Sequence, residues 1–362
     1  MKVPRLIAAR TWLAFPVSVL LFLVSPGFGA EPDPGDPTAE PFQLSVDPAQ
    51  GEFTLIVVPD TQRYAAYFPE ILLRQFEWIR DSLDLLNVKY VIHLGDLVEE
   101  GHEDEWRVVD QAFSMLDGRI PYLVVPGNHD LDRAPARQGL RASTRFNAVF
   151  SPKRFAGRPW YGGSYGVTGD NSFGYFKAAD REFLVLGLEY GPSDETLQWA
   201  DSLVSNHEQR VILATHCYMY DDDTRLGEGD QWNPHKVNEY WNDGEQIWQK
   251  LVAGRENIVM VLSGHVKGDG TGLLVSENNE GGPVVQMLSN YQFLSHGGQG
   301  FLRILKFNPA DDTLDVHTYS PWLDQWRDEE DQRFSLPVPG ILGEESAPTP
   351  EMIDHENTTD PS

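Results

Sequence analysis

The sequence predicts an α/β fold in which two mixed β-sheets are flanked by helices, and three features lead to this prediction. First, five apolar runs are continuous rather than alternating, which is typical of strands buried on both faces. Second, segments with helical periodicity separate the early runs, as in parallel βαβ units. Third, six later strand-like runs have turn-length connections, which favours antiparallel pairing.

The predicted elements follow from the spacing of apolar residues along the chain. The five continuous runs are Phe53 to Val58, Tyr90 to Leu94, Tyr122 to Val125, Val211 to Ala214 and Ile258 to Leu262. Helices are predicted at Pro69 to Leu86, Glu103 to Leu116, Asp194 to Val204 and Val237 to Leu251. The later strands are predicted at Phe173 to Lys177, Phe183 to Leu188, Leu273 to Glu277, Pro283 to Leu288, Phe301 to Phe307 and Leu314 to Tyr319.

Each of the five continuous runs ends at a residue of a type that binds metals. The ends read VVPDTQ, HLGDLVE, VVPGNHD, ATHCY and LSGHVKGD, and they supply Asp60, Asp96, Asn128 with His129, His216 and His265. Their carboxylate, amide and imidazole groups suit first-row divalent metals. Because ligands of an open α/β sheet bind beyond the carboxyl ends of its strands, we expect these side chains to converge on one site. Taken singly, each residue has a plainer explanation as a helix cap, a polar turn or a core histidine.

This set of motifs resembles the calcineurin-like metallophosphoesterase family. The family signature runs Asp-x-His, Gly-Asp, Gly-Asn-His-Asp/Glu, a lone His and Gly-His-x-His. The corresponding residues here are Asp60-Thr61-Gln62, Gly95-Asp96, Gly127-Asn128-His129-Asp130, His216 and Gly264-His265-Val266-Lys267. Gln62 and Lys267 stand where the signature has histidines. The resemblance covers residues 53 to about 319 and implies a four-layer α/β/β/α sandwich of two mixed sheets flanked by helices.

The resemblance implies a centre of two divalent metal ions (Mn, Fe, Zn or Mg) that hydrolyses a phosphomonoester or a phosphodiester. Two cations would clamp the phosphate and lower the pKa of a bound water, so that metal-bound hydroxide attacks phosphorus. The implied ligands are Asp96 as a bridge, Asn128, His216 and His265 at one position, and Asp60 with Gln62 at the other. His129 is implied to donate a proton to the leaving group, with Asp130 as its orienting partner.

The two departures from the signature concern the second metal position. A protonated lysine has no lone pair, so Lys267 cannot bind a cation, whereas Gln62 can bind a hard ion through its amide oxygen. Lys267 could point outward and leave Asp269, in the same glycine-rich turn, as the substitute ligand, or it could contact the phosphate. The departures also leave open a degenerate family member that acts as a binding or cell-surface interaction module with at most one metal. A metal-dependent hydrolase of another kind of substrate is a third alternative.

The segment Leu131 to Asn171 is aperiodic and follows the Gly-Asn-His-Asp motif directly. It is predicted to form the rim of the site, or else to cover a sheet edge. Its arginines nearest the motif are Arg133, Arg137, Arg141 and Arg145. One of them could bind a substrate phosphate. Cys217 is the only cysteine, and because neighbours on a strand point to opposite faces, it is predicted to be a buried structural thiol rather than a nucleophile.

The ends of the chain are predicted to lie outside the catalytic domain, which is assigned to residues 51–327. Residues 1–30 have the basic start, apolar core and small-residue exit of a cleavable signal peptide, so we expect a secreted or periplasmic protein. An uncleaved membrane anchor is the alternative. Residues 31–50 are expected to form a proline- and acid-rich leader, and residues 328–362 an acidic, proline-rich disordered tail.

The charge of the chain restricts its partners. The formal net charge is −27 over 362 residues, whereas nucleic-acid binders concentrate lysine and arginine. We therefore expect no nucleic acid in bulk and, after signal cleavage, no membrane as a partner. A small phosphoester, drawn in by the local charge of the metals, is the expected substrate. The sequence contains no indication of an oligomeric state.

Overall fold

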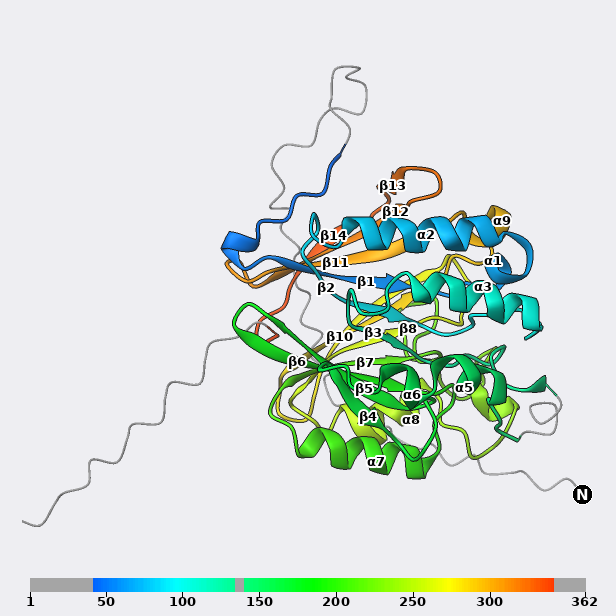
Figure 1. Ribbon diagram of the computed structural model, residues 1–362. Coiled ribbons are helices and arrows are strands. Elements are labelled where there is room, and N and C mark those ends of the chain that lie inside the picture. Colours follow the sequence, from blue (N-terminus) through cyan, green and yellow to red (C-terminus); the bar gives the residue numbers. More distant parts are fainter. Residues whose placement is uncertain (1–41, 134–139, 342–362) are drawn as a thin grey trace, which may run out of the picture. The chain divides into compact units, whose positions relative to one another are not determined.

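The computed structural model describes residues 42–133 and 140–341, and within these ranges the chain forms two seven-stranded sheets (Figure 1). The first sheet has the order β13-β12-β11-β1-β2-β3, with β14 paired to β12. Its strands are β1 (Phe53–Val58), β2 (Val88–His93), β3 (Tyr122–Val124), β11 (Leu302–Asn308), β12 (Thr313–Ser320), β13 (Gln325–Arg327) and β14 (Phe334–Pro337). The second sheet has the order β4-β5-β6-β7-β8-β10-β9. Its strands are β4 (Tyr161–Ser164), β5 (Ser172–Ala178), β6 (Arg181–Leu188), β7 (Arg210–Thr215), β8 (Ile258–Ser263), β9 (Thr271–Glu277) and β10 (Pro283–Ser289).

Helices cover the outer face of each sheet, so the predicted four-layer α/β/β/α sandwich is confirmed (Figure 1). α2 (Pro69–Ser82) and α3 (Glu103–Ser114) pack on the first sheet. α7 (Asp194–Ser205) and the π-helical turn η3 (Trp248–Val252) pack on the second. The shorter segments are α1 (Gln62–Tyr67), α5 (Thr144–Phe150), α6 (Pro152–Phe155), α8 (Gly244–Ile247), α9 (Ser295–Gly298), η1 (Pro48–Gln50) and η2 (Pro234–Lys236). No helix in the described ranges is long and apolar enough to span a bilayer.

The continuous apolar runs follow from this layering, since a strand between two layers buries both of its faces. In β1, Phe53 and Leu55 face the second sheet, whereas Ile56 faces α2 and α3. Cys217 lies in the core under α7, as predicted for a structural thiol. The strands β1, β2 and β3 are parallel to one another, as are β7, β8 and β10. Parallel pairing brings the carboxyl ends of each group to one edge of its sheet.

The helix predicted at Val237 to Leu251 is wrong at its start. The chain becomes helical only at α8, because Asp243 forms a capping box there. The Asp243 side chain accepts a hydrogen bond from Gln246 N at 2.9 Å, while Asp243 N donates to Gln246 Oε1 at 3.1 Å. The preceding residues form a loop in which Trp241 is buried.

Both boundaries of the folded domain extend beyond the expected 51–327. In the segment expected to be a leader, Leu44 and Val46 pack against the core under α2 and α3. In the segment expected to be disordered, β14 pairs with β12, and Val338 and Ile341 join the core between the sheets. These segments hold too few apolar residues to form a core of their own, but enough to extend one that exists. The predicted signal peptide and the remaining parts of the leader and tail lie outside the described residues.

A buried histidine lies where the N-terminal segment meets the first sheet. His317 on β12 is 5% exposed, its ring stacks on Phe42 with centroids 5.3 Å apart, and neither ring nitrogen has a hydrogen-bond partner among the described residues. Burial lowers the pKa of His317 to about 4, with smaller and opposing effects from the charges of Asp315, Arg333 and Lys306. The native ring is therefore neutral at pH values where an exposed histidine binds a proton.

His317 should make the stability of the protein depend on pH. Its folded pKa lies below the unfolded value of about 6.5, so stability that is present above pH 6.5 is lost as the pH falls toward 4. Urea unfolding at pH 7.5 and pH 5 would measure this loss, which should be smaller by about 2 kcal/mol in the His317→Phe variant than in the wild-type protein. Equal losses in the two proteins would show that another group is responsible.

Candidate metal centre

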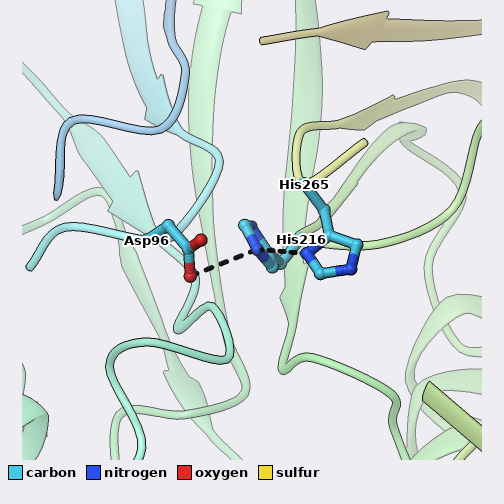
Figure 2. Close-up of side chains that lie close together, drawn as sticks. All are labelled: Asp96, His216 and His265. Atoms are coloured by element: carbon cyan, nitrogen blue, oxygen red, sulfur yellow. Dashed lines mark hydrogen bonds and ion pairs between the residues drawn. The ribbon is translucent and has the colours of Figure 1, made fainter. Parts of the chain in front are cut away.

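Three of the predicted strand-end residues form a compact cluster where the two sheets meet (Figure 2). Asp96 follows β2 in the first sheet, whereas His216 and His265 follow β7 and β8 in the second. One ligand atom from each lies within 4.8 Å of the other two, and Asp96 and His216 are almost fully buried. The fold therefore brings Asp96 together with two histidines that lie more than a hundred positions further along the chain.

The hydrogen bonds of the two imidazoles leave their lone pairs facing one another. His216 Nδ1 lies 2.7 Å from Leu94 O and His265 Nε2 lies 3.0 Å from Trp232 O, so each of these nitrogens donates to a carbonyl. In the neutral rings the acceptor atoms are then His216 Nε2 and His265 Nδ1, which lie 3.1 Å apart (Figure 2). Asp96 Oδ1 lies 3.3 Å from His216 Nε2. Two lone pairs and a carboxylate at this spacing require a positive charge between them.

The pKa values of the cluster also indicate that a positive charge is needed among the three groups. Burial opposes a charged His216, but the Asp96 carboxylate beside it raises the pKa of His216 to about 9. Burial, followed by the charge on His216, lowers the pKa of His265 to about 3. Without a metal, the three groups therefore share one proton, and a divalent cation would take the place of that proton.

Asn128, the fourth ligand that the resemblance implies for this position, has an unpaired amide oxygen. Asn128 follows β3, and its Oδ1 is buried with no hydrogen-bond partner among the described residues. An unpaired buried carbonyl oxygen is unfavourable by roughly 1–3 kcal/mol, which binding to a cation would relieve. Asp96, Asn128, His216 and His265 together offer the oxygen and imidazole donors that Mn, Fe and Zn bind, so this position fits a metal ion.

The glycines of the motifs are required because backbone approaches carboxylate closely. A Cβ on Gly127 would lie 2.2 Å from Asp96 Oδ1, and a Cβ on Gly264 would lie 2.2 Å from Asp60 Oδ2. Asp96 and His265 themselves adopt left-handed backbone, with φ of 53° and 70°. Such backbone is unfavourable for residues other than glycine and clusters at functional sites. The geometry of the site, rather than local preference, therefore explains these turns.

A network of amides surrounds the second predicted metal position. Asp60, which follows β1, accepts hydrogen bonds at Oδ1 from Asn290 Nδ2 at 3.3 Å and from Gln292 Nε2 at 3.1 Å. Gln62 Nε2 donates to Asp96 Oδ2 at 3.1 Å and to Gln292 Oε1 at 2.8 Å. Gln62 Oε1 is buried without a partner among the described residues, so it is available to a cation. This position fits a metal less well than the first, because amide donors already bind the Asp60 carboxylate.

Asn290 and Gln292 are absent from the predicted site, although the sequence contains a signal for them. They follow β10 in the segment MLSNYQF, which makes a sixth strand end with polar residues. This end differs from the other five because it offers neutral amides alone. Such residues are common in ordinary turns, so the signal is weak.

Asp269, the predicted substitute ligand, is not part of the metal-type cluster found among the described residues. Its side chain is exposed, and Oδ1 accepts a hydrogen bond from Thr271 N at 3.1 Å. The glycine-rich turn packs against an earlier loop, since a Cβ on Gly268 would lie 2.1 Å from a carboxylate oxygen of that loop. Lys267 Nζ lies 5.4 Å from the centroid of the Trp232 ring, in a cation–π contact. The turn therefore supports the loop rather than folding back on the site.

The side chains of His129 and Asp130 both form hydrogen bonds with backbone groups of neighbouring loops. His129 Nδ1 lies 2.7 Å from Glu99 O and donates to it, which leaves Nε2 for proton exchange with a substrate. The Asp96 carboxylate, opposed by burial, raises the pKa of His129. The oxygens of Asp130 accept from three backbone N–H groups at 2.7–3.2 Å. Asp130 is therefore not the orienting partner of His129; it joins the loops that carry Asp96 and Asn128.

The arginines that follow the motif bind protein groups. Arg133 pairs with Glu100 at 2.8 Å and also donates to two backbone carbonyls. Arg141 pairs with a buried glutamate at 3.0 Å, and Arg145 donates to a backbone carbonyl. Arg137 lies outside the described residues. Arg133, Arg141 and Arg145 therefore stabilise the surrounding loops instead of presenting an unpaired charge to phosphate.

A cavity of about 240 Å³ opens beside the cluster. It is lined by Asn128, His129, Leu131, Arg133, Tyr190, Val237 and Trp241. Through Asn128 it reaches the first metal position, and through His129 it reaches the candidate proton donor. A substrate needs both groups, so this cavity is the candidate binding site.

The motifs can be compared with those of known proteins. The family model described as calcineurin-like phosphoesterase matches residues 53–268, which is more than half of the chain. The chain belongs to the calcineurin-like phosphoesterase family. The matched segment contains all four donors of the first metal position in this phosphoesterase, whereas Asn290 and Gln292 lie beyond it.

Two curated relatives of this phosphoesterase are similar in sequence. The uncharacterized protein YvnB of Bacillus subtilis (strain 168) is 35% identical over 295 residues, which cover 78% of this chain and 21% of YvnB. A protein of Moraxella catarrhalis (strain BBH18) named "probable cyclic nucleotide phosphodiesterase" is 26% identical over 196 residues, which cover 50% of this chain and 59% of that protein. The chain thus spans about a fifth of the first relative and three fifths of the second.

Two solved structures also resemble this phosphoesterase. The purple acid phosphatase PPD1 from yellow lupin (Lupinus luteus) seeds has a TM-score of 0.48 and 11% sequence identity, covering 79% of this chain and 54% of that chain. GAP50, described as the anchor in the inner membrane complex of Plasmodium, has a TM-score of 0.44 and 10% identity, covering 80% of this chain and 89% of that chain.

The two predicted metal positions should differ in affinity. Calorimetric titration of the metal-free protein with Mn²⁺ should show one tight and one weak site, because a cation at Asp60 must displace amide hydrogen bonds. The Asn128→Ala variant should bind at the tight site at least roughly 10-fold more weakly, since it lacks a ligand. Two equally tight sites in the wild-type protein would contradict this prediction.

Asn308 provides a matched control. Its Oδ1 is also buried without a partner among the described residues, but it lies at the end of β11 and outside the metal cluster. The Asn308→Ala variant should therefore keep wild-type affinity for Mn²⁺. Equal weakening in both variants would mean that loss of a buried amide, rather than loss of a ligand, explains the effect.

Proposed function

We propose that this protein is an exported, metal-dependent phosphoesterase that hydrolyses a small phosphomonoester or phosphodiester. The observation that carries the proposal is the arrangement of His216, His265 and Asp96 around a space that requires a cation, with His129 beside it. Membership of the phosphoesterase family supports the reaction type. The signal-like pattern of residues 1–30 supports export.

The residues of the site suggest how the reaction is divided among them. Divalent cations bound there would neutralise charge on the phosphoryl oxygens and lower the pKa of a water. Asp96, whose Oδ1 also accepts a hydrogen bond from His129 N at 3.0 Å, holds the proton donor close to the metal position. His129 donates from Nε2 to the leaving oxygen, because its Nδ1 is bound to a carbonyl. Asp130 holds together the loops that carry Asp96 and Asn128, and so fixes the position from which the proton is transferred.

Phosphodiesters are included among the proposed substrates for a specific reason. Similarity to the Moraxella protein, whose name gives a probable cyclic nucleotide phosphodiesterase, supports this extension. The net charge of −27 supports a small substrate, since a polyanion would be repelled.

A second candidate function is a binding module that holds at most one metal. The amide network around Asp60 favours it, because Gln62 and Gln292 donate to carboxylate oxygens that a second cation would otherwise bind. Such a module would bind Mn²⁺ and phosphate but would not turn over an ester. An activity assay therefore separates the two candidates.

Hydrolysis of p-nitrophenyl phosphate or bis(p-nitrophenyl) phosphate should require added Mn²⁺ and stop in excess chelator. The Asp96→Ala variant should be inactive, because Asp96 serves both positions and orients His129, whereas Asp269→Ala should retain wild-type activity. Binding of Mn²⁺ without turnover of either ester would favour the module. Retention by Asp96→Ala of more than roughly a tenth of the wild-type rate would refute the metal-dependent mechanism.

The His129→Ala variant should turn over roughly 10²- to 10⁴-fold more slowly while its metal content stays unchanged. The loss should be smaller for p-nitrophenyl than for phenyl esters, because a better leaving group needs less protonation. His207→Ala is the control, since His207 Nδ1 also bonds to a carbonyl, at 2.7 Å, but lies beyond α7. If His129→Ala loses metal instead, the residue is a ligand rather than a proton donor.

A further inference from the structure

The cavity beside the metal cluster has an aromatic wall that adjoins the reacting groups. The rings of Tyr190 and Trp241 meet edge to face, with centroids 5.8 Å apart and an angle of 86°. The Tyr190 ring also lies 5.2 Å from that of His265 and 5.9 Å from that of His216. Because His129 lines the same cavity, a group bound against this wall sits on the side of phosphorus from which the leaving oxygen takes its proton.

The wall is held in place before any ligand binds. Tyr190 and Trp241 are 3% and 5% exposed. The Arg141 guanidinium lies 4.4 Å from the centroid of the Trp241 ring and donates to Tyr190 O and Gly191 O, each at 2.6 Å. Glu189 pairs with the same guanidinium at 3.0 Å. A rigid apolar surface loses little freedom on binding, which favours affinity for a flat ring.

Apart from His129, the described residues that line the cavity offer no unpaired cation for a second anionic group. Arg133 is the arginine that lines it, and Glu100 and two backbone carbonyls bind its guanidinium. The remaining wall residues include Leu131 and Val237, which are apolar. An uncharged group is therefore favoured there over a second phosphate or a carboxylate.

We propose that this cavity receives an uncharged aromatic ring carried by the ester group that leaves, as in an aryl phosphoester or a nucleoside phosphoester. This inference rests on the proposed phosphoesterase function and names its substrate class. The volume of about 240 Å³ is sufficient, because an apolar protein cavity of about 150 Å³ already holds benzene. Trp241 and Tyr190 are then residues that determine specificity, and Arg141 is a positioning residue behind them.

Binding of phosphonates that cannot be hydrolysed tests the proposal directly. Calorimetry on the Mn²⁺-loaded protein should show that phenylphosphonate binds roughly 10-fold or more tightly than methylphosphonate. Trp241→Leu should remove this preference and leave the affinity for methylphosphonate unchanged. Trp248→Leu is the control, because Trp248 also has an arginine over its ring, at 4.3 Å, but does not line the cavity.

A second pair of ligands distinguishes the two sources of the ring. Adenosine 5′-monophosphate should bind more tightly than ribose 5-phosphate if the ring is a nucleobase, and equally if the cavity takes a simple aryl group. Equal affinity for the members of both pairs, in a protein that hydrolyses p-nitrophenyl phosphate, would overturn the aromatic subsite and leave the proposed function standing. Failure of every phosphonate and phosphate to bind, with no hydrolysis, would overturn both.

Discussion

The rest of the structure depends on the contact between Asp96, His216 and His265. His216 Nε2 lies 3.1 Å from His265 Nδ1 and 3.3 Å from Asp96 Oδ1, and both Asp96 and His216 are almost fully buried. Such a group of lone pairs and negative charge is unfavourable unless a proton or a metal cation lies among them. Asp96 comes from one sheet and the histidines from the other, so the same cation would also link the two halves of the sandwich. Binding of a metal here would therefore be coupled to folding.

Amide side chains surround the second position, where the family signature has imidazoles. The buried Asp60 carboxylate accepts hydrogen bonds from the side chains of Asn290 and Gln292 and from His265 N. A neutral imidazole at position 62 would have one donor and one acceptor. Gln62 instead makes two donations and leaves Oε1 buried without a partner among the described residues. The amides thus supply donors to both carboxylates and leave one oxygen that a cation would satisfy.

The parts of the structure that the sequence could predict are those governed by strong local patterns. Runs such as Phe53 to Val58 and the glycines beside Asp96 and His265 indicate strands, their ends and the first metal position. Asn290 and Gln292 could not be assigned in the same way, because their role depends on pairing across 230 residues with Asp60 and Gln62. The carboxylate of Asp269 suggests a metal ligand, but the sequence does not show which way its glycine-rich turn folds.

The start of α8 was missed for a different reason. The apolar residues from Val237 onward have helical spacing, although the chain is not helical there. The helix begins after Asp243, which forms a capping box with Gln246 three residues later. The capping box, rather than the longer apolar pattern, therefore determines where α8 begins. As a consequence Trp241 lies in a loop, where its ring can turn toward the cavity beside His129.

Residues 328–341 belong to the domain because they satisfy a buried charge. Arg303 on β11 is 1% exposed; its Nε donates to Tyr291 Oη at 3.1 Å and its Nη2 donates to Asp331 O at 2.9 Å. In the sequence, Tyr291 lies between Asn290 and Gln292, the two amide residues of the second position. Thr271 Oγ1 also donates to Asp331 Oδ2 at 2.7 Å. Loss of this segment would leave a buried guanidinium without its carbonyl acceptor, which is more unfavourable than the loss of a few apolar contacts. Hydrogen bonding to Arg303, more than apolar area, therefore explains why an acidic and proline-rich segment is ordered here and supports the strand end at Asn290.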